Sequence, residues 1–444
     1  MFFKLRQMLI CIAALLCFVA PLSLRSQQPR PTRKVILMIG DGMGYSEITL
    51  ARNYYYGAAG RLEMDAFTET GSATTYSLLE SKPALPNYVT DSAAGGTAWA
   101  TGKKTSNGRI STAAGTNEPL KTILELAQNN GVKVGDVSTA ELTDATPAVL
   151  GSHVSSRKCQ GPADMADCLN EKKGAGGLGS IAEQLIDHRI DVLLGGGKQR
   201  FDQIIDGGPQ TGKSVLDQAK ETGYSIVTDL NGLNAARAGE RVLGLFNSGN
   251  MSLEWSGDPA IPFPGSGPQK CHEFSRTETE PSLMSMTLKA ISLLGGDDLS
   301  SRFFLQIEGA QIDKNDHAAK PCEQIGETIA FDNAIKLVLD YARVHPDTLV
   351  IVTADHAQTS QIVPVPEKGS DPVPGYLSTL ITTDKAPLTV AYSTNTICCA
   401  GSHFMEHTGS QVRLAAFGPG AEQFSGHHDM TEVFDLIRKA LDLK

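Results

Sequence analysis

Short apolar runs rich in β-branched residues alternate along this chain with longer stretches in which apolar residues recur at helical spacing. The clearest strand-like runs are Val35–Ile39, Asp191–Leu194, Phe303–Ile307 and Thr348–Thr353, and the clearest helical stretches are Leu120–Ala127, Ile181–Ile186, Leu283–Leu294 and Ile325–Ala342. Because this alternation is typical of parallel strands joined by helices, we predict an α/β fold whose central, mostly parallel β-sheet is flanked by helices on both faces. Two segments rich in Pro and Gly, Trp255–Gly267 and Pro364–Gly375, are expected to be small inserted loops.

The charge of the chain limits its partners. The 444 residues carry a formal net charge of −10, and no basic stretch offsets it. This composition argues against a nucleic-acid partner. An acidic protein that acts on phosphate esters needs positive charge supplied locally, by metal ions or by arginine.

The N-terminal residues have the pattern of an export signal. Lys4 and Arg6 precede the apolar run Met8–Ala20, and polar residues follow from Ser26. The run is short for a membrane span, although an uncleaved anchor is the alternative. We therefore expect residues 1–26 to be a signal peptide, and the remaining protein to be periplasmic or secreted without stable membrane association.

Export would permit disulfides among the eight cysteines. Cys11 and Cys17 lie in the expected signal. Cys159 and Cys168 flank a short polar loop and are expected to pair, and Cys271 with Cys322 is a second candidate pair. The state of the neighbours Cys398 and Cys399 stays open, because adjacent cysteines rarely bond to each other. None of these spacings indicates a zinc-thiolate site.

Acidic residues follow three of the predicted strands directly. Asp41 comes after Val35–Ile39, Glu308 follows Ile307, and the pair Asp355-His356 follows Thr348–Thr353. In open α/β sheets, ligands bind beyond the carboxyl ends of the strands. Any one of these residues could simply cap a helix. Together they predict a rim of carboxylates that would repel one another without cations.

A carboxylate and an imidazole follow Glu308 at helical spacing. Asp313 and His317 are four residues apart, so on a helix they share one face. Zinc accepts both ligand types, although such a pair alone is more often a surface pair. His407 could complete the site from a distant loop. His403 is the rival ligand, and the sequence alone barely separates the two.

Ser92 is the candidate nucleophile. It precedes the small residues Ala93 to Ala98, a pattern that suits a helix start at which backbone amides favour an anion. The stretch has no Gly-x-Ser-x-Gly motif, so activation of the hydroxyl by metal is more natural than a Ser-His-Asp triad. Asp91 or Ser92 could instead be only a helix cap. Arg157 could clamp two phosphate oxygens.

Seven motifs occur in a familiar order along the chain, and in them the sequence resembles the bacterial periplasmic alkaline phosphatases. The motifs are Gly40–Gly44, Thr90–Ala94, Asp144–Pro147, Glu308–Ala310, Asp313–His317, Thr353–His356 and Glu406–Gly409. The resemblance runs from about Lys34 to the C-terminus. It implies that residues 27–444 form a catalytic domain that hydrolyses phosphate monoesters, with a homodimer as the expected assembly.

The resemblance also implies a role for each matching residue. Ser92 would become a phosphoserine, Arg157 would hold the phosphate oriented by Asp91, and Asp144 and Lys314 would act through water near magnesium and phosphate. Two Zn²⁺ and one Mg²⁺ are implied. The ligands would be Asp313, His317 and His407 for the first zinc, Asp41, Asp355 and His356 for the second, and Asp41, Thr146 and Glu308 for magnesium.

The resemblance is incomplete in places, and two rival functions remain to be weighed. Gly95-Gly96 stands where the family more commonly has Ser and Ala, and the Cys398-Cys399 pair is foreign to its pattern.

A phosphodiesterase or sulfatase of the same superfamily is the first rival function. Arg157 favours monoesters, because diesterases usually lack its equivalent. The second rival, a non-catalytic exported binding protein, predicts a damaged nucleophile or ligand, and every one is present.

Overall fold

The computed structural model describes residues 32–367, 369, 371–398 and 402–444, with only the backbone for the residues between 395 and 403. The expected signal peptide, the cysteines at 11 and 17, and Cys399 lie outside the described residues, as does the thiol of Cys398. Within the described part, no helix is both long and apolar enough to cross a membrane.

A ten-stranded sheet forms the centre of the fold, as predicted. In spatial order its strands are β21 (Gly426–Asp429), β2 (Glu69–Thr74), β20 (Val412–Phe417), β14 (Thr348–Thr353), β1 (Lys34–Gly40), β13 (Phe303–Gly309), β5 (Lys133–Glu141), β6 (Val192–Gly196), β8 (Arg241–Leu245) and β7 (Tyr224–Val227). All neighbours from β14 to β7 are parallel, and only β20 pairs antiparallel with its neighbours. The sheet is therefore mostly parallel.

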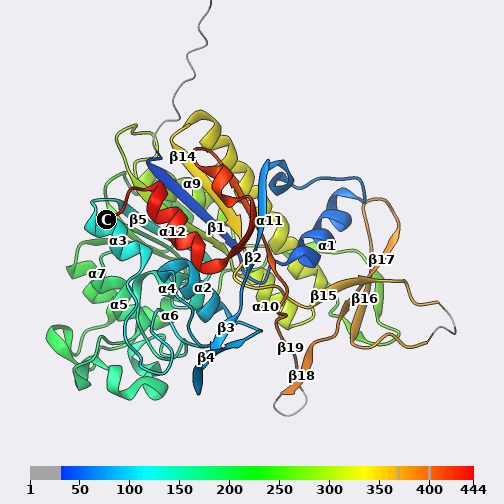
Figure 1. Ribbon diagram of the computed structural model, residues 1–444, viewed down its shortest axis with the longest axis horizontal. Coiled ribbons are helices and arrows are strands. Elements are labelled where there is room, and N and C mark those ends of the chain that lie inside the picture. The colour runs from blue at the N-terminus through cyan, green and yellow to red at the C-terminus, as the bar shows by residue number, and fades with distance from the viewer. Residues whose placement is uncertain (1–31, 368, 370, 399–401) are drawn as a thin grey trace, which may run out of the picture. The chain divides into compact units, whose positions relative to one another are not determined.

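Helices cover both faces of this sheet (Figure 1). The helices α9 (Leu283–Leu293) and α11 (Pro321–Val344) pack on one face, and the other carries α2 (Ser92–Thr101), α3 (Ile123–Asn129), α4 (Ala145–Gly151) and α12 (Met430–Ala440). Every residue of β1, β13 and β14 is buried, because layers cover these strands from both sides. The predicted helix at Leu120–Ala127 begins only at Ile123. Thr122 caps it there, accepting from the Glu125 amide, while the Glu125 carboxylate accepts from the Thr122 amide.

A second, smaller sheet is built from segments that are far apart in the sequence. Its strands are β10 (Ile261–Pro262), β16 (Tyr376–Ile381), β17 (Pro387–Tyr392) and β15 (Ser360–Val363), and β11 (Ser266–Gln269) pairs with β16. The segment Trp255–Gly267 is thus more than an inserted loop, because it contributes short strands to this sheet. The segment Pro364–Gly375 connects β15 to β16. Farther on, β18 (Asn395–Cys398) and β19 (Ser402–Met405) form a hairpin.

Both predicted disulfides are formed. Cys159 is bonded to Cys168 with their Cα atoms 6.3 Å apart, and Cys271 is bonded to Cys322 with their Cα atoms 5.2 Å apart. The second bond ties the start of α11 to the chain that precedes α9. The first bond closes a loop onto the 3₁₀ segment Pro162–Glu171, so only the second reaches a helix that packs on the sheet.

The helix α11 buries a carboxyl group away from the sheet ends. Glu327 is 3% exposed and accepts a hydrogen bond of 2.9 Å from the Glu254 amide. Burial, with a smaller contribution from the Glu254 carboxylate, raises the pKa of Glu327 to about 8. In the folded protein the Glu327 carboxyl group therefore stays protonated at pH values well above its ordinary pKa of 4.5.

We predict that Glu327→Gln flattens the pH dependence of stability. An acid whose folded pKa is raised stabilises the fold fully below its unfolded pKa, and that stability is lost as pH rises toward about 8. The amide of glutamine can keep the hydrogen bond from Glu254 without ionising. Urea unfolding from pH 5 to 9 should show a smaller fall for the variant, which should be more stable than the wild type by about 1–3 kcal/mol at pH 9. The exposed control Glu422→Gln should follow the wild type, and a Glu327→Gln curve parallel to it would contradict the prediction.

Candidate active site

Ser92 is the first residue of α2, and the residue before it fixes the start of that helix. Asp91 is the N-cap, and its carboxylate accepts a 3.0 Å hydrogen bond from the Ala94 amide. Ser92 is 2% exposed. A Cβ atom at Gly95 would lie 2.7 Å from the carbonyl oxygen of Asp355, so glycine lets the helix approach the end of β14 closely. The serine is thereby held against the residues that follow that strand.

Beside Ser92 lies a cluster of buried carboxylates around one imidazole. Ser92 Oγ is 3.3 Å from His356 Nε2, which in turn is 3.2 Å from Asp355 Oδ2, 3.5 Å from Asp41 Oδ1 and 3.9 Å from Asp313 Oδ1. Asp355 Oδ1 accepts hydrogen bonds from the amides of Gly42 and His356. The oxygens Asp355 Oδ2 and Asp41 Oδ1 are buried without a hydrogen-bond partner. Buried carboxylate oxygens of this kind fit a metal ion, which would supply the missing positive charge.

A second cluster adjoins the first through Asp313. His317 Nε2 lies 3.1 Å from Asp313 Oδ2, and His407 Nε2 lies 3.3 Å from Asp313 Oδ1. The two imidazole Nε2 atoms are 3.0 Å apart. Each ring uses its Nδ1 on a backbone carbonyl, that of Met405 for His317 and that of Thr90 for His407. If each Nδ1 is the donor, two Nε2 lone pairs face each other, an arrangement that fits a shared cation and the outer-shell pattern of metal-binding histidines.

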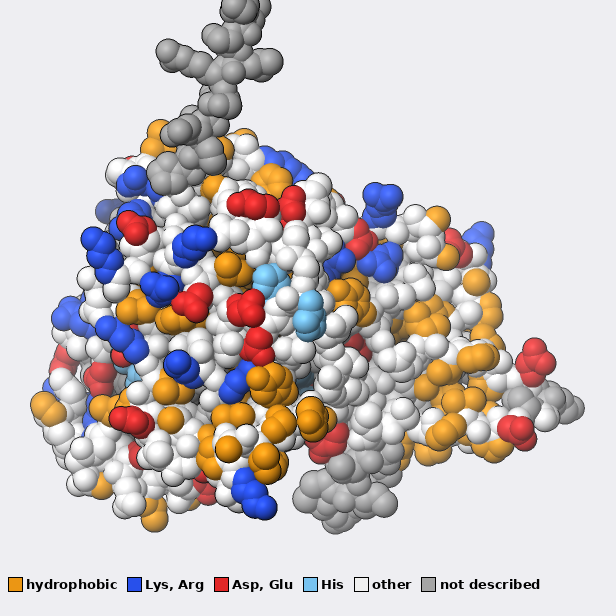
Figure 2. Space-filling view, in the orientation of Figure 1, with side chains coloured by type: hydrophobic (Ala, Val, Ile, Leu, Met, Phe, Trp, Pro, Cys, Tyr) orange, Lys and Arg blue, Asp and Glu red, His pale blue; other side chains and the backbone are white. Residues whose placement is uncertain are grey.

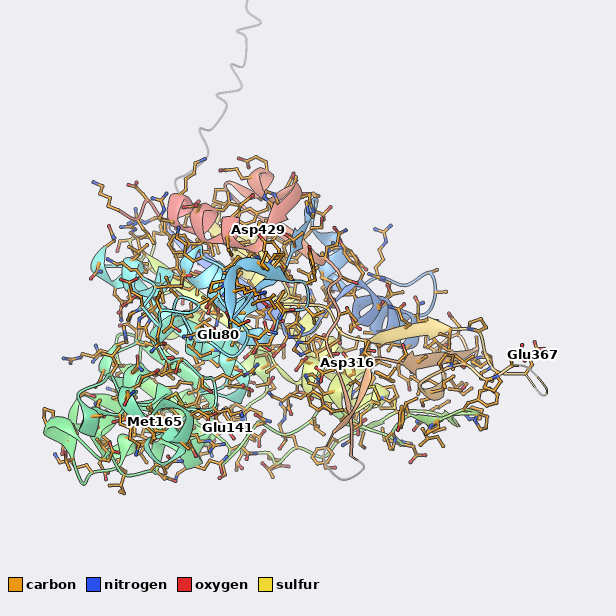
Figure 3. All side chains as sticks on the ribbon, turned by 60° about the horizontal axis from the view of Figure 1, so that its bottom comes forward. Glu80, Glu141, Met165, Asp316, Glu367 and Asp429 are labelled. Atoms are coloured by element: carbon orange, nitrogen blue, oxygen red, sulfur yellow. A yellow bond between two sulfur atoms is a disulfide. The ribbon has the colours of Figure 1, made fainter. Side chains whose placement is uncertain are left out.

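The structure places His407 in this cluster on the segment after β19. The backbone of His403, the rival ligand, pairs with that of Ile397 in the hairpin, and its side chain lies outside the described residues. Asp316, on the same helix as Asp313, does not join the cluster. It is fully buried, and burial together with the nearby Glu47 carboxylate raises its pKa well above the usual range. Asp316, labelled in Figure 3, belongs to α10 (Gln311–His317).

A third group of oxygen atoms surrounds Glu308 at the end of β13. Ser138 Oγ donates to Glu308 Oε2 from the neighbouring strand β5. Thr146, on α4, has a buried hydroxyl that makes no hydrogen bond of good geometry, although it is near enough to lower the pKa of Glu308. Burial outweighs these contacts and raises the pKa of Glu308 to about 8. An all-oxygen set of this kind suits Mg²⁺.

The pKa values of Asp41, after β1, and Asp313, after β13, are shifted in opposite directions. Burial, followed by the charges of Asp355, Asp313 and Glu308, raises the pKa of Asp41 well above its usual range. Burial also acts to raise the pKa of Asp313, but His317 and His407 outweigh it and hold that pKa well below the usual range. The charge of Lys314 lowers the pKa of Asp41 less than burial and the neighbouring carboxylates raise it, and a bound cation would offset this excess of negative charge.

Positive charge enters the site through an ion-pair network. Arg157 donates to Asp91 Oδ2 over 3.2 Å and to Asp144 Oδ1 over 2.9 Å, and Lys314 donates to the other oxygen of Asp144. The backbone amide of Arg157 donates to Gly108 over 2.7 Å, two residues before the disulfide at Cys159. The guanidinium is therefore held by two carboxylates and by its own backbone.

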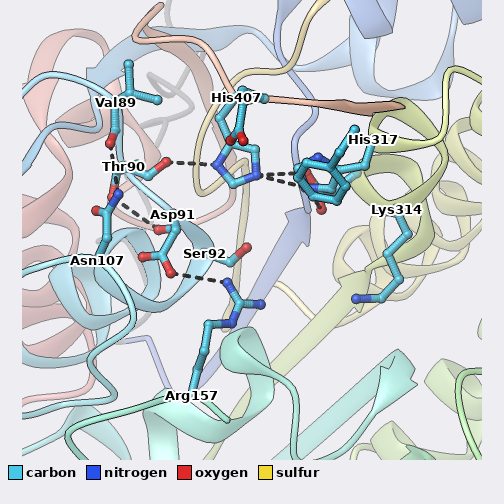
Figure 4. A pocket seen from close by; sticks show the side chains of 12 residues that line it. Val89, Thr90, Asp91, Ser92, Asn107, Arg157, Lys314, His317 and His407 are labelled. Atoms are coloured by element: carbon cyan, nitrogen blue, oxygen red, sulfur yellow. Dashed lines mark hydrogen bonds and ion pairs between the residues drawn. The ribbon is translucent and has the colours of Figure 1, made fainter. Parts of the chain in front are cut away.

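Ser92, Arg157, Lys314 and the cluster of Asp313, His317 and His407 line one cavity of about 480 Å³. In Figure 4, Ser92 lies between Arg157 and His407, and Lys314 and His317 lie at the right of the view. The cavity is lined by Val89, Thr90, Asp91, Ser92, Asn107, Arg157, Asp313, Lys314, His317, Phe404, Glu406 and His407. The ring of Phe404 stacks on that of His317, with centroids 4.0 Å apart.

The structure places every residue predicted for the site in these connected clusters. Sequence reasoning missed Ser138, Asn107 and Phe404. Ser138 lies in a strand whose mixed polarity hid it, and no motif marks the other two. The face seen in Figure 2 mixes Lys and Arg with Asp and Glu, in keeping with the lack of a basic stretch in the sequence.

Comparison with known proteins identifies the class of protein that this fold and site define. The family model described as alkaline phosphatase matches residues 32–400. The chain is 46% identical to alkaline phosphatase H of Pseudomonas aeruginosa, over 95% of this chain and 87% of that protein, and 44% identical to the Escherichia coli alkaline phosphatase, over 94% and 88%. It is also 46% identical to a streptomycin-6-phosphate phosphatase of Streptomyces griseus, over 94% and 92%.

Solved structures give the same result. The alkaline phosphatase of the Antarctic bacterium TAB5 matches with a TM-score of 0.69 and 26% identity, over 94% of this chain and all of that one. The chain therefore belongs to the alkaline phosphatase family. It is an enzyme that hydrolyses phosphate monoesters, and the activity of this family depends on metal ions.

We predict that removal of metal destabilises the fold as well as the activity. Without cations the buried carboxylates Asp41, Asp313 and Asp355 repel one another, and a ligand that binds only the folded state stabilises it by mass action. Calorimetry after chelation should show a Tm lower by on the order of 10 °C, and restored zinc and magnesium should reverse the shift. A Tm that is the same with and without metal would contradict a metal site at these residues.

Proposed function

We propose that hydrolysis proceeds through a phosphoserine formed on Ser92. The observation that carries the proposal is the position of Ser92 Oγ, 3.3 Å from His356 Nε2 and in one cavity with Arg157. A serine hydroxyl is a poor nucleophile until its proton is drawn off or its alkoxide is stabilised. The carboxylates around His356 supply the ligands for a cation that would do so.

We assign three metal sites to the clusters. One Zn²⁺ would be held by Asp313, His317 and His407, a second by Asp41, Asp355 and His356, and Mg²⁺ by Asp41, Thr146 and Glu308. The nitrogen and carboxylate donors suit zinc, and the oxygen donors suit magnesium. A related solved structure supports the last choice, since it is that of a TAB5 alkaline phosphatase variant with Mg bound in the M3 site. When bound, such ions supply Lewis-acid stabilisation of the attacking and leaving oxygens and lower the pKa of a water.

The protein's own residues position the phosphoryl group. Arg157 presents a planar fork of donors to two phosphate oxygens, and Asp91 and Asp144 hold that fork in place. Lys314, bound to the other oxygen of Asp144, adds positive charge to the same wall. The free amides at the start of α2 favour an anion at Ser92. Ser92 itself is placed for attack because Asp91 fixes the helix start directly before it.

The same arginine favours monoesters over diesters. A monoester offers free oxygens to both donors of the guanidinium, whereas a diester replaces one of them with a second ester group. The cavity also bears the ring of Phe404 and the side chain of Asn107 at its lining, where the leaving group of a substrate would lie. The natural substrate is a small phosphate monoester whose alcohol part fits this opening.

The remaining parts of the proposal concern where the enzyme acts. Residues 1–26 would be removed as a signal peptide, leaving residues 27–444 as the catalytic domain in the periplasm or outside the cell, without stable membrane association. A homodimer is the expected assembly.

Ser92→Ala tests the nucleophile. The variant should lose about 10³-fold or more in kcat on a chromogenic phosphate monoester, because no hydroxyl remains to attack phosphorus. Its metal content, measured by mass spectrometry after gel filtration, should stay equal to that of the wild type. Rapid quench with labelled substrate should trap phosphoserine only in the wild type. Ser282→Ala, which removes the N-cap of α9, is the matched control and should retain activity. Loss of metal in Ser92→Ala, or a trapped phosphoenzyme without Ser92, would overturn the assignment.

Arg157→Ala should weaken the binding of inorganic phosphate by about 10- to 100-fold, as expected for the loss of a charge-assisted bidentate contact. Its activity on a monoester should fall far more than any residual activity on a diester. Lys158→Ala is the control, since that side chain is 80% exposed and lies 3.7 Å from Asp167. Equal inhibition of Arg157→Ala and wild type by phosphate would exclude this role for the arginine.

A further inference from the structure

A second group of metal-binding side chains lies outside the catalytic cavity. Glu125 belongs to α3, His153 follows α4, and His188 is the C-cap of α5 (Ile181–Asp187). One ligand atom from each of the three lies within 4.8 Å of the other two. None of them lines the catalytic cavity, and the mechanism uses none of them.

Two of the three side chains are already oriented for a shared ligand. His153 Nδ1 lies 2.9 Å from the carbonyl oxygen of Ser111, so its Nε2 is the atom that faces Glu125 Oε1, 3.5 Å away. Glu125 Oε2 accepts from the Thr122 amide over 2.7 Å, which leaves Oε1 for the histidine side. Two ligands bound to tetrahedral zinc at about 2.0–2.1 Å lie roughly 3.4 Å apart. The observed separation matches that value.

The backbone of both histidines is fixed by neighbouring helices. The amide of His153 donates to Gln184 Oε1 on α5 over 2.9 Å, and the carbonyl of His188 accepts from Gln128 Nε2 on α3 over 2.8 Å. The two rings have centroids 6.2 Å apart and are inclined at 56°, so they are not stacked on each other. The three ligand atoms lie within 4.8 Å of one another, so they would have to move closer together to bind one ion.

These three side chains are buried enough to hold a structural ion, and solvent can still reach the site beside Glu125. The side chain of His153 is 5% exposed and that of Glu125 is 24% exposed. Burial lowers the pKa of His188, so this imidazole keeps a free nitrogen lone pair at neutral pH. The hydrogen bond with Glu125 raises the pKa of His153 although burial acts against it, so a proton shared by this pair competes with a metal ion.

We propose that Glu125, His153 and His188 bind a further zinc ion, with water as the fourth ligand, which crosslinks α3, α4 and α5. Two imidazoles and a carboxylate are a ligand set that zinc accepts, and each of the first two donors has the backbone partner usual in such sites. The site lies beside the segment that holds the phosphate. Val154 pairs with Ile110 next to Ser111, and Arg157 follows three residues later. Zinc there would stiffen the chain that carries the guanidinium.

The test counts zinc in the holoenzyme, purified with its catalytic metals and equilibrated with zinc alone before gel filtration. Wild type should hold one zinc per chain more than either His188→Ala or Glu125→Gln. Glutamine keeps the side-chain oxygen that the Thr122 amide needs, so the second variant separates lost charge from lost helix capping. His272→Ala, an exposed histidine distant in sequence from the group, is the control and should hold the wild-type count.

Two further readouts do not depend on turnover. Diffraction from wild-type crystals at the zinc edge should show an anomalous peak among the three side chains. Zinc added to the holoenzyme should raise the Tm by about 2–4 °C in the wild type but not in the variants. Monoester hydrolysis by His188→Ala should stay within about twofold of the wild-type rate. Because the zinc count, the anomalous peak and the Tm do not depend on turnover, this test stands even if the catalytic proposal fails. Equal zinc counts in all four proteins and no anomalous peak would show an ordinary ion pair and overturn the proposal.

Discussion

The crowding of carboxylates at one end of the parallel sheet is the constraint on which this structure depends. The register of the central strands pairs Ile39 with both Glu308 and Thr353, so the residues that follow β1, β13 and β14 reach the same level. Asp41 and Asp355 therefore meet around His356 in a region with almost no solvent. Isolated buried carboxylates are costly, and the protein tolerates them because the large buried core around β1 holds the strand ends in place and cations can offset their charge.

Ser92, the proposed nucleophile, is tied to this cluster by backbone packing. Gly95 leaves no side chain between α2 and the carbonyl of Asp355, and Asp91 fixes the first turn of the helix. A Cβ atom at this position would lie 2.7 Å from that carbonyl oxygen, so the close approach of helix and strand end favours glycine here. Any shift of β14 would move Ser92 and His356 together. The distance between hydroxyl and imidazole is therefore a property of the sheet and helix, more than of either side chain.

Much of this arrangement could be predicted from the sequence, for a physical reason. Parallel strands point their carboxyl ends to one edge, so Asp41, Glu308 and Asp355 could be grouped from strand position alone. The spacing of Asp313 and His317 gave their shared helix face. The sequence could not reveal Ser138, because β5 mixes polar and apolar residues although all of its residues between the two ends are buried. Nor could it predict that Trp255–Gly267 contributes strands, because pairing with β16 depends on a partner more than a hundred residues away.

The prediction of His407 as a metal ligand shows the same limit at the level of one residue. His403 and His407 are four residues apart, and the pattern alone treats them alike. The structure shows a contact of His407 that no local pattern contains: its Nδ1 lies 2.9 Å from the carbonyl of Thr90, directly before the N-cap of α2. That contact joins the imidazole to the helix start that carries Ser92. The imidazole of one cluster and the Ser92 hydroxyl beside the other are consequently positioned by the same short segment, Thr90 to Ser92.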